Sequence, residues 1–168
     1  NGKTLSNYRF ASNDGPDYVG LFSYLGHGGQ IRNLILEGVE IATPASFCVG
    51  GLVGLNDNGT VWGCRVHGQI VGKNVVGGIV GLNWRATVSR CRIMGEVHGQ
   101  NKIGGLVGYS YGGSIIQDCS FQGVVTGNSA IGGIAGTSEE FIRIKRCYST
   151  GVVRGGVLLR LARDRAAV

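Results

Sequence analysis

The chain has 168 residues, of which 43% are hydrophobic and 15% are charged, so it can bury a core and is not intrinsically disordered. Its 32 glycines follow no Gly-X-Y period, which excludes collagen, and no apolar run reaches the ~18 residues of a membrane helix. The formal charge of +6 is compatible with anionic partners, although a mildly basic surface without a function explains it more simply. The chain opens in the middle of a repeated pattern, without a signal peptide, and we expect a fragment or a processed product.

A six-residue glycine motif returns at regular intervals along the chain. It reads Val-Gly-Gly-Leu-Val-Gly at residues 49–54 and recurs at residues 76–81, 103–108 and 131–136, with a degenerate copy at residues 18–22. The copies start near residues 19, 49, 76, 103 and 131, so one repeat takes 26–30 residues. Self-similarity at such a period is typical of solenoids, in which each repeat forms one coil.

A second set of columns follows each motif at fixed distances. A cysteine occupies the first of these columns, and glycines follow it four and eight residues later. The column members are Cys64, Cys91, Cys119 and Cys147, preceded by Leu34 and Tyr8; the first glycines are Gly38, Gly68, Gly95, Gly123 and Gly151, and the second are Gly72, Gly99, Gly127 and Gly155. The columns predict three short strands per coil: the motif, the segment through the cysteine, and the segment between the later glycines. Glycines are expected at the corners because they adopt positive φ without a steric cost.

The sequence therefore predicts an all-β fold, a parallel β-helix or β-solenoid of about six coils over residues 1–155. Equivalent strands would pair in parallel about 4.8 Å apart, so that each column becomes a ladder of like side chains. The handedness of parallel crossovers favours a right-handed winding. Residues 156–168 lack glycine after Gly156 and are rich in helix formers, so we expect a short helix or extension that caps the last coil or docks a partner.

The motif, the cysteine and the following Gly-x-Val-x-Gly together resemble the GLUG repeat. The resemblance covers residues 1–155, except that Leu21-Phe22-Ser23 replaces the expected Gly-Leu-Val in the first coil. GLUG repeats are similar to those of large bacterial surface proteins, including adhesins and the N-terminal regions of immunoglobulin A1 metalloproteases. The resemblance implies a secreted or cell-surface location and a repeat scaffold. It supplies no catalytic residues, and the sequence contains no HExxH motif.

The cysteine column, Cys64, Cys91, Cys119 and Cys147, is open to a structural and a disulfide interpretation. Neighbours in a ladder lie within disulfide range, but parallel side chains in a packed core suit the S–S dihedral poorly. Leu34 and Tyr8 in the same column cannot form a disulfide, which favours buried thiols acting as small hydrophobic groups. Cys48 lies outside the column and is either inert or able to pair with another chain.

No pattern of an enzyme or of a cofactor or metal site emerges from the polar residues. None of the ten acidic residues forms an evident acid–base pair, and the Gly-Gly dipeptides lack the Lys-Ser/Thr of a phosphate loop. There is no Cys-x-x-Cys, and His27, His67 and His98 fall in different columns. We therefore expect no catalytic residues, no cofactor and no metal.

Candidate binding residues lie at the turns and beside the cysteine column. Stacking of the variable turns would place Trp84, Arg85, Tyr111 and Phe141 along one edge, where they either bind a sugar or protein or cover the core. Arg65 and Arg92 would stack as like charges one residue after the cysteines, and either splay apart or share a sulfate or an acidic sugar.

The leading hypothesis is a non-catalytic extracellular structural or adhesive module. Its partners would be a cell-surface glycan or protein, or further copies that stack end to end into a filament, because an uncapped coil is a template for another chain. The alternatives are a substrate-positioning region of a larger secreted enzyme and, with less support, a polysaccharide-active β-helix. Nucleic acid is not an expected partner.

Overall fold

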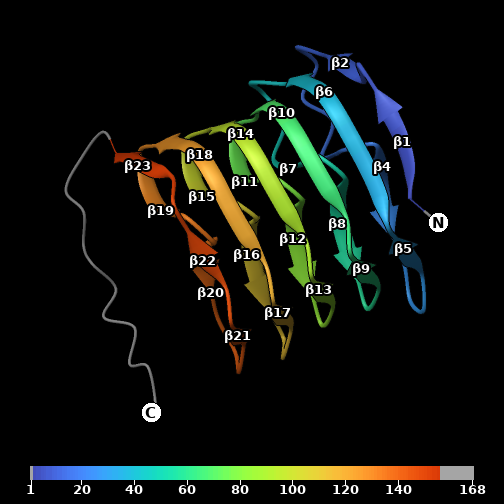
Figure 1. Ribbon diagram of the computed structural model, residues 1–168. Helices are drawn as coiled ribbons and strands as arrows, with labels where there is room; N and C mark the ends of the chain where they lie inside the picture. Colours follow the sequence, from blue (N-terminus) through green and yellow to red (C-terminus); the bar gives the residue numbers. More distant parts are fainter. Residues whose placement is uncertain (1, 156–168) are drawn as a thin grey trace.

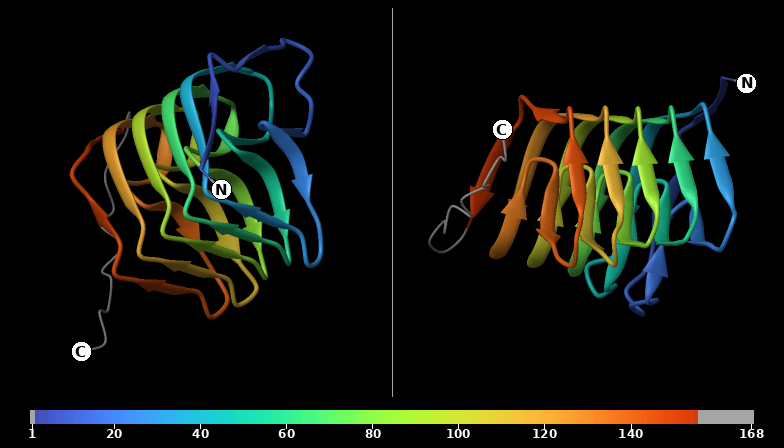
Figure 2. Two further views of the ribbon diagram at one scale, coloured as in Figure 1. Left: turned by 45° about the vertical axis from the view of Figure 1, so that its right-hand side comes forward. Right: turned by 90° about the horizontal axis from the view of Figure 1, so that it is seen from below.

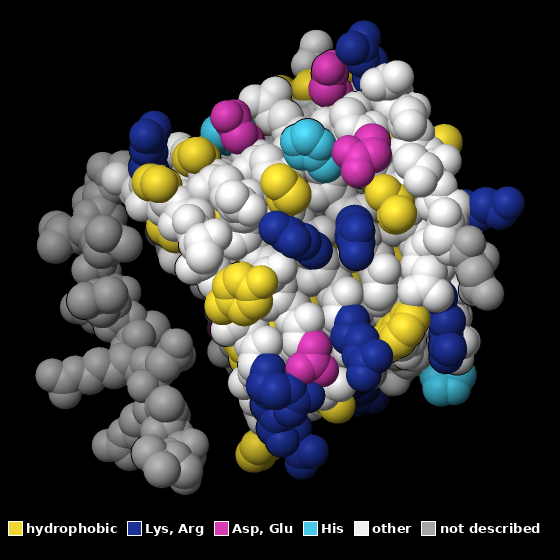
Figure 3. Space-filling model, in the orientation of Figure 1, with side chains coloured by type: hydrophobic (Ala, Val, Ile, Leu, Met, Phe, Trp, Pro, Cys, Tyr) yellow, Lys and Arg dark blue, Asp and Glu magenta, His cyan; other side chains and the backbone are white. Residues whose placement is uncertain are grey.

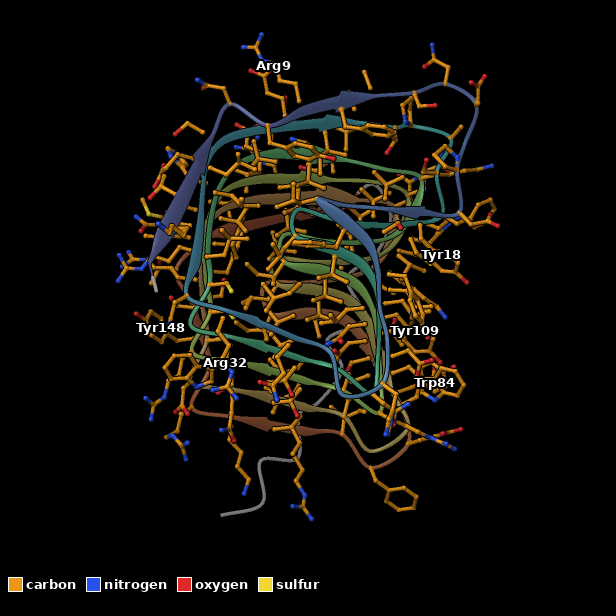
Figure 4. The ribbon with its side chains drawn as sticks, turned by 90° about the vertical axis from the view of Figure 1, so that its right-hand side faces the viewer. Arg9, Tyr18, Arg32, Trp84, Tyr109 and Tyr148 are labelled. Carbon is orange, nitrogen blue, oxygen red and sulfur yellow. The ribbon has the colours of Figure 1, made fainter. Side chains whose placement is uncertain are left out.

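The repeats wind into a β-solenoid whose equivalent strands lie side by side in parallel sheets (Figure 1). The computed structural model describes residues 2–155. Viewed from the N-terminal end, the chain runs clockwise as it recedes, so the winding is right-handed, as predicted (Figure 4). Within the described residues all regular structure is β-strand.

Four sheets, here called A to D, form the walls of the solenoid (Figure 2). Sheet A contains β1 (Lys3–Ser6), β2 (Arg9–Ala11), β6 (Leu34–Ala42), β10 (Arg65–Val71), β14 (Arg92–His98), β18 (Ser120–Gly127), β22 (Tyr148–Ser149) and β23 (Val152–Gly155). Sheet B contains β3 (Tyr18–Val19), β7 (Cys48–Gly50), β11 (Asn74–Gly77), β15 (Asn101–Gly104) and β19 (Ser129–Gly132).

Sheet C contains β4 (Phe22–Leu25), β8 (Val53–Asp57), β12 (Val80–Trp84), β16 (Val107–Tyr111) and β20 (Ala135–Ser138). Sheet D contains β5 (Gln30–Arg32), β9 (Thr60–Trp62), β13 (Thr87–Ser89), β17 (Ile115–Gln117) and β21 (Arg143–Lys145). Because sheets B, C and D have five strands each, the described part makes about five turns rather than the predicted six.

Each coil has four strands instead of the predicted three. Two of the predicted strands are each divided by a bend, and the third is continuous with the second half of its predecessor. The glycine motif is the end of a sheet B strand, a bend and the start of a sheet C strand: β7 ends at Gly50 and β8 begins at Val53. The segment through the cysteine is broken at Gly63 and Cys64. The predicted third strand is the second half of a long sheet A strand, since β10 runs through Gly68 to Val71. The predicted cap lies outside the described residues.

The corner before each cysteine requires a left-handed backbone. Asn33, Gly63, Arg90, Asp118 and Arg146 occupy this position, with φ of 53°, 67°, 53°, 56° and 49°. A non-glycine residue in this conformation costs about 1–2 kcal/mol, so the corner is strained in the later coils and relaxed at Gly63. Only one of these five residues is a glycine, so the position shows no recurrent glycine, and the break cannot be predicted from the sequence.

The core is a set of inward columns that repeat from coil to coil. Sheet D contributes Val61, Val88 and Ile116, sheet A contributes Val66, Ile93 and Phe121, and the motif bend contributes Leu52, Ile79 and Leu106; all are 0–2% exposed. Burial of each such side chain is worth about 1.5–3 kcal/mol. Because each coil buries these groups against its neighbours, the stability of the solenoid resides in the interfaces between coils.

The three glycines of the motif each meet backbone where a side chain would stand. A Cβ at Gly77 would overlap the carbonyl oxygen of Val80 and lie 2.7 Å from the nitrogen of Gly108 in the next coil. A Cβ at Gly78 would overlap the carbonyl oxygen of Gly105, and one at Gly81 would lie 2.7 Å from the nitrogen of Val49 in the preceding coil. The backbones of sheets B and C are therefore in direct contact at the motif. We call this contact, formed by the three glycines of each motif, the glycine wedge.

We predict that Gly77→Ala destabilises the protein by about 3 kcal/mol or more, because the new methyl group meets backbone that cannot rotate away. Urea unfolding followed by circular dichroism measures the loss. The matched control is Gly28→Ala, where nothing lies within 4 Å but φ is 73°, so that only the left-handed backbone costs about 1 kcal/mol. Equal losses at the two positions would show that the wedge is not tightly packed.

Candidate functional site

The outer surface of sheet C holds the aromatic residues that follow the glycine motif. β12 pairs with β16 so that Leu82 lies opposite Tyr109 and Trp84 lies opposite Tyr111. Two columns thus run side by side along the solenoid axis, as expected when like positions stack in a parallel sheet. Trp84 and Tyr109 point away from the ribbon on the same side of the molecule (Figure 4).

The aromatic rings stack in a continuous series, which we call the aromatic ladder (Trp84, Tyr109 and Tyr111). The ring centroids of Trp84 and Tyr111 are 5.6 Å apart with planes at 6°, and those of Tyr109 and Tyr111 are 5.2 Å apart with planes at 15°. Stacked pairs of this kind contribute about 0.5–1.5 kcal/mol beyond the area they bury. The three rings are half-buried, so part of each remains open to solvent.

Cationic groups flank the aromatic ladder at both ends. The guanidinium carbon of Arg85 lies 5.4 Å from the Trp84 ring, and Lys102 Nζ lies 3.9 Å from the centroid of Tyr109. Lys102 belongs to sheet B and Tyr109 to sheet C, and the glycine wedge brings these two sheets close enough for the contact. The site therefore combines apolar ring surface with positive charge.

A carboxylate holds one rung of the ladder in place. The Tyr109 hydroxyl donates a hydrogen bond of 2.7 Å to Glu139 Oε2 from the next coil. This hydrogen bond, assisted by burial, raises the pKa of Tyr109 to about 12. The phenol is therefore protonated, and remains a donor, throughout the physiological pH range.

Beneath the ladder lies a column of fully buried polar side chains, Asn56, Asn83 and Ser110. Asn56 Nδ2 donates to Asn83 Oδ1 at 2.9 Å, and Asn83 Nδ2 donates to the carbonyl oxygen of Ala86 at 3.2 Å. These bonds fix the turn that carries Trp84 and Arg85. The signal for this buried column in the sequence is the recurrence of Asn at a spacing of 27 residues.

The structure brings together three of the four predicted edge residues. Trp84, Arg85 and Tyr111 form one cluster, whereas Phe141 stands apart on its loop with 94% of its surface exposed. Tyr109 and Lys102 were missed. The position of Tyr109, two residues before Tyr111 on the same face of a strand, was the available signal for the first of them.

The cysteine column lies at the corner between sheets D and A. Cys64, Cys91 and Cys119 are 0–1% exposed, Cys147 is half-buried, and all five cysteines of the chain are free. The Cys91 thiol donates to the carbonyl oxygen of Ser89 at 3.2 Å, and the same carbonyl accepts from the backbone amide of Gly63 in the preceding coil at 2.9 Å. The flanking thiols of Cys119 and Cys64, together with burial, hold the pKa of Cys91 well above its usual range. Burial, followed by the charge of Asp17, raises the pKa of Cys48 to about 11.

Arg65 and Arg92 occupy neighbouring rungs on the outside of sheet A, as the column spacing predicted. β10 pairs with β14 so that Arg65 lies directly opposite Arg92. Both side chains are exposed, and Arg92 Nη2 donates to Gln122 Oε1 at 3.3 Å. In the column one residue before the cysteines, Arg146 pairs with Asp118 of the neighbouring coil.

Residues 2–155 contain no group of three His, Cys, Asp or Glu side chains that could hold a metal ion. Nor does that part of the chain contain a helix long and apolar enough to span a membrane. The carboxylates for which the structure gives a partner face Arg, His, Tyr, Asn or Gln side chains rather than each other.

Comparison with known proteins matches two segments of the chain. Residues 45–71 and residues 99–126 match the family model of the GLUG motif. Each segment runs from the strand of sheet B or the loop before it, through the glycine wedge and the cysteine corner, to the end of the sheet A strand. No curated protein and no solved structure matches the chain.

Proposed function

Because the chain is a β-solenoid of GLUG repeats, we propose that it serves outside the cell as a non-catalytic adhesive module. The observation that carries the proposal is the aromatic ladder, in which Trp84 and Tyr111 stack at 5.6 Å with nearly parallel planes on a rigid sheet. A solenoid holds such groups at fixed spacing without ordering a loop on binding, so little conformational entropy is lost.

The chemistry of the ladder suits a cell-surface glycan or an exposed protein loop. Sugar rings present C–H faces that pack on aromatic rings, and Arg85 and Lys102 add donors at the edges. Phe141, exposed on the loop of the next coil and apart from the ladder, offers a separate apolar contact. The same surface would position a substrate if the chain were part of a larger secreted enzyme.

We predict that Trp84→Ala weakens binding to the recognised glycan about tenfold or more, because it removes the largest ring of the aromatic ladder. The measurement is retention on a panel of immobilised neutral oligosaccharides, followed by titration calorimetry with the best of them. Far-UV circular dichroism should be unchanged, since Trp84 is half-buried and outside the core.

The matched control is Trp62→Ala, which removes a half-buried tryptophan of sheet D that the guanidinium of Arg90 covers at 5.4 Å. Equal retention of the Trp84 variant and the native protein on every oligosaccharide that the native protein binds would contradict the proposed role of the ladder.

End-to-end assembly is a second candidate function, favoured by the two ends of the described solenoid. The C-terminal end has an open hollow of about 820 Å³ lined by Ile134, Ala135, Ile142 and Ile144, among others. The N-terminal end exposes Phe22 and Tyr24, the latter to 52%. Sheet edges that carry the same columns can continue the parallel pairing of one copy into the next, which would build a filament.

We expect the purified chain to form rods that lengthen with concentration when viewed by negative-stain electron microscopy. Replacing the apolar N-terminal pair, as in Phe22→Lys/Tyr24→Lys, should shorten the rods because it places charge at the contact. Separate short particles at every concentration would exclude assembly by the chain alone.

A further inference from the structure

The positive charge of the chain is concentrated on one face. The outward positions of sheet D, the cysteine corner and the adjoining half of sheet A bear seven cationic side chains and one carboxylate. We call this the basic face: Arg32, Arg65, Arg90, Arg92, Arg143, Lys145 and Arg146, with Asp118. Its net charge equals the formal charge of the whole chain, +6, so the rest of the molecule is neutral on balance.

Sheet A carries positive and negative side chains at different positions along its strands. In Figure 3 most dark blue groups on the visible face lie over its middle and lower part, whereas magenta, cyan and further dark blue groups lie toward the top. On sheet A, Glu37 contacts His67 and Glu96 contacts His98, at 3.1 and 3.0 Å, and Glu40 pairs with Arg9. The charges of Arg65 and Arg92 therefore lie next to the cysteine corner, and the carboxylates of sheet A lie farther along its strands.

Most of the cations on the basic face have no carboxylate partner within the described residues. Only Arg146 forms an ion pair there, with Asp118, whose pKa that contact lowers. Arg65 and Arg92 face each other across one strand spacing, about 4.8 Å, an arrangement of like charges that costs free energy unless an anion lies between them. Two exposed arginines whose backbones lie one strand spacing apart can both donate to the oxygens of one sulfate or carboxylate group.

We propose that the basic face binds an acidic polysaccharide, with sulfate or uronate groups bridging successive coils. Hydroxyl and amide groups lie among the cations, including Thr60, Thr87, Ser120 and Gln117, and these match the hydroxyls of a sugar chain. The basic face is distinct from the aromatic ladder of sheet C. A substitution in one of these surfaces should therefore leave ligand binding at the other unchanged.

The face is poorly suited to nucleic acid, although nucleic acid is also a polyanion. Single strands are held by a series of open aromatic rings on which successive bases stack; Arg90 covers the ring of Trp62, and among the described residues of this face only Tyr148, 61% exposed in the column of Arg65 and Arg92, offers an open ring. A duplex is recognised by an element that enters a groove, and the basic face consists of flat sheet and tight corners. An acidic polysaccharide requires neither feature.

The test uses dextran sulfate as the probe, with neutral dextran and a single-stranded DNA oligomer as comparisons. Binding of the native chain is measured by fluorescence anisotropy over a series of salt concentrations. The expected result is saturable binding to dextran sulfate, no binding to neutral dextran, and weaker binding to DNA at matched charge.

Two variants and one matched control locate the site. Arg65→Gln/Arg92→Gln should weaken binding about tenfold and lower the slope of log Kd against log salt by about 2, whereas Asp118→Asn should strengthen binding. Lys73→Gln/Arg154→Gln removes the same charge elsewhere and should retain nearly native affinity. Equal losses in the two double variants, tighter binding of DNA, or no binding to dextran sulfate at low salt would each overturn the proposal.

Discussion

The close approach of backbone to backbone at the glycine wedge is the constraint on which the rest of the structure depends. A methyl group at Gly77, Gly78 or Gly81 would collide with a peptide group of the same or a neighbouring coil. The wedge sends Leu52, Ile79 and Leu106 into the centre of the cross-section, where all three are fully buried. It also fixes the register of each coil against the next, because three glycines must meet three particular peptide groups.

Because the register between coils is fixed, side chains at equivalent positions of successive coils form continuous surfaces along the solenoid. Since residue 84 must lie beside residue 111, and residue 65 beside residue 92, each outward position becomes a ladder with a fixed step. Sheet C uses this regularity to stack aromatic rings, and the corner between sheets D and A uses it to gather cations. The interior uses it for columns of amides and thiols, in which Asn56 donates to Asn83 and Cys91 donates to the carbonyl oxygen of Ser89. One architectural rule therefore supplies both the scaffold and the surfaces that it presents.

The sequence was sufficient to predict the solenoid, its period, its winding and the buried column of cysteines, because these depend on a repeat that can be read directly. It was insufficient for the corners, where Arg90, Asp118 and Arg146 adopt a left-handed backbone that residue type does not reveal. The same limit applies to the site. Trp84 and Tyr111 could be paired by counting, but Lys102 reaches Tyr109 only because sheets B and C meet at the wedge, a contact between different columns. The burial of Asn83 could not be predicted from its residue type, since asparagine is typical of exposed turns.

The most direct test of the glycine wedge is native-state hydrogen exchange of backbone amides, resolved by NMR. The amides of Ile79, Val80 and Leu106 donate to the carbonyl groups of the next coil at 2.9–3.1 Å inside the wedge. If the wedge holds the coils together, these amides should be among the slowest to exchange and should open only with global unfolding. Faster exchange of these amides than of those in β10 and β14 on sheet A would contradict the account, because the wedge would then open while the outer wall stayed closed.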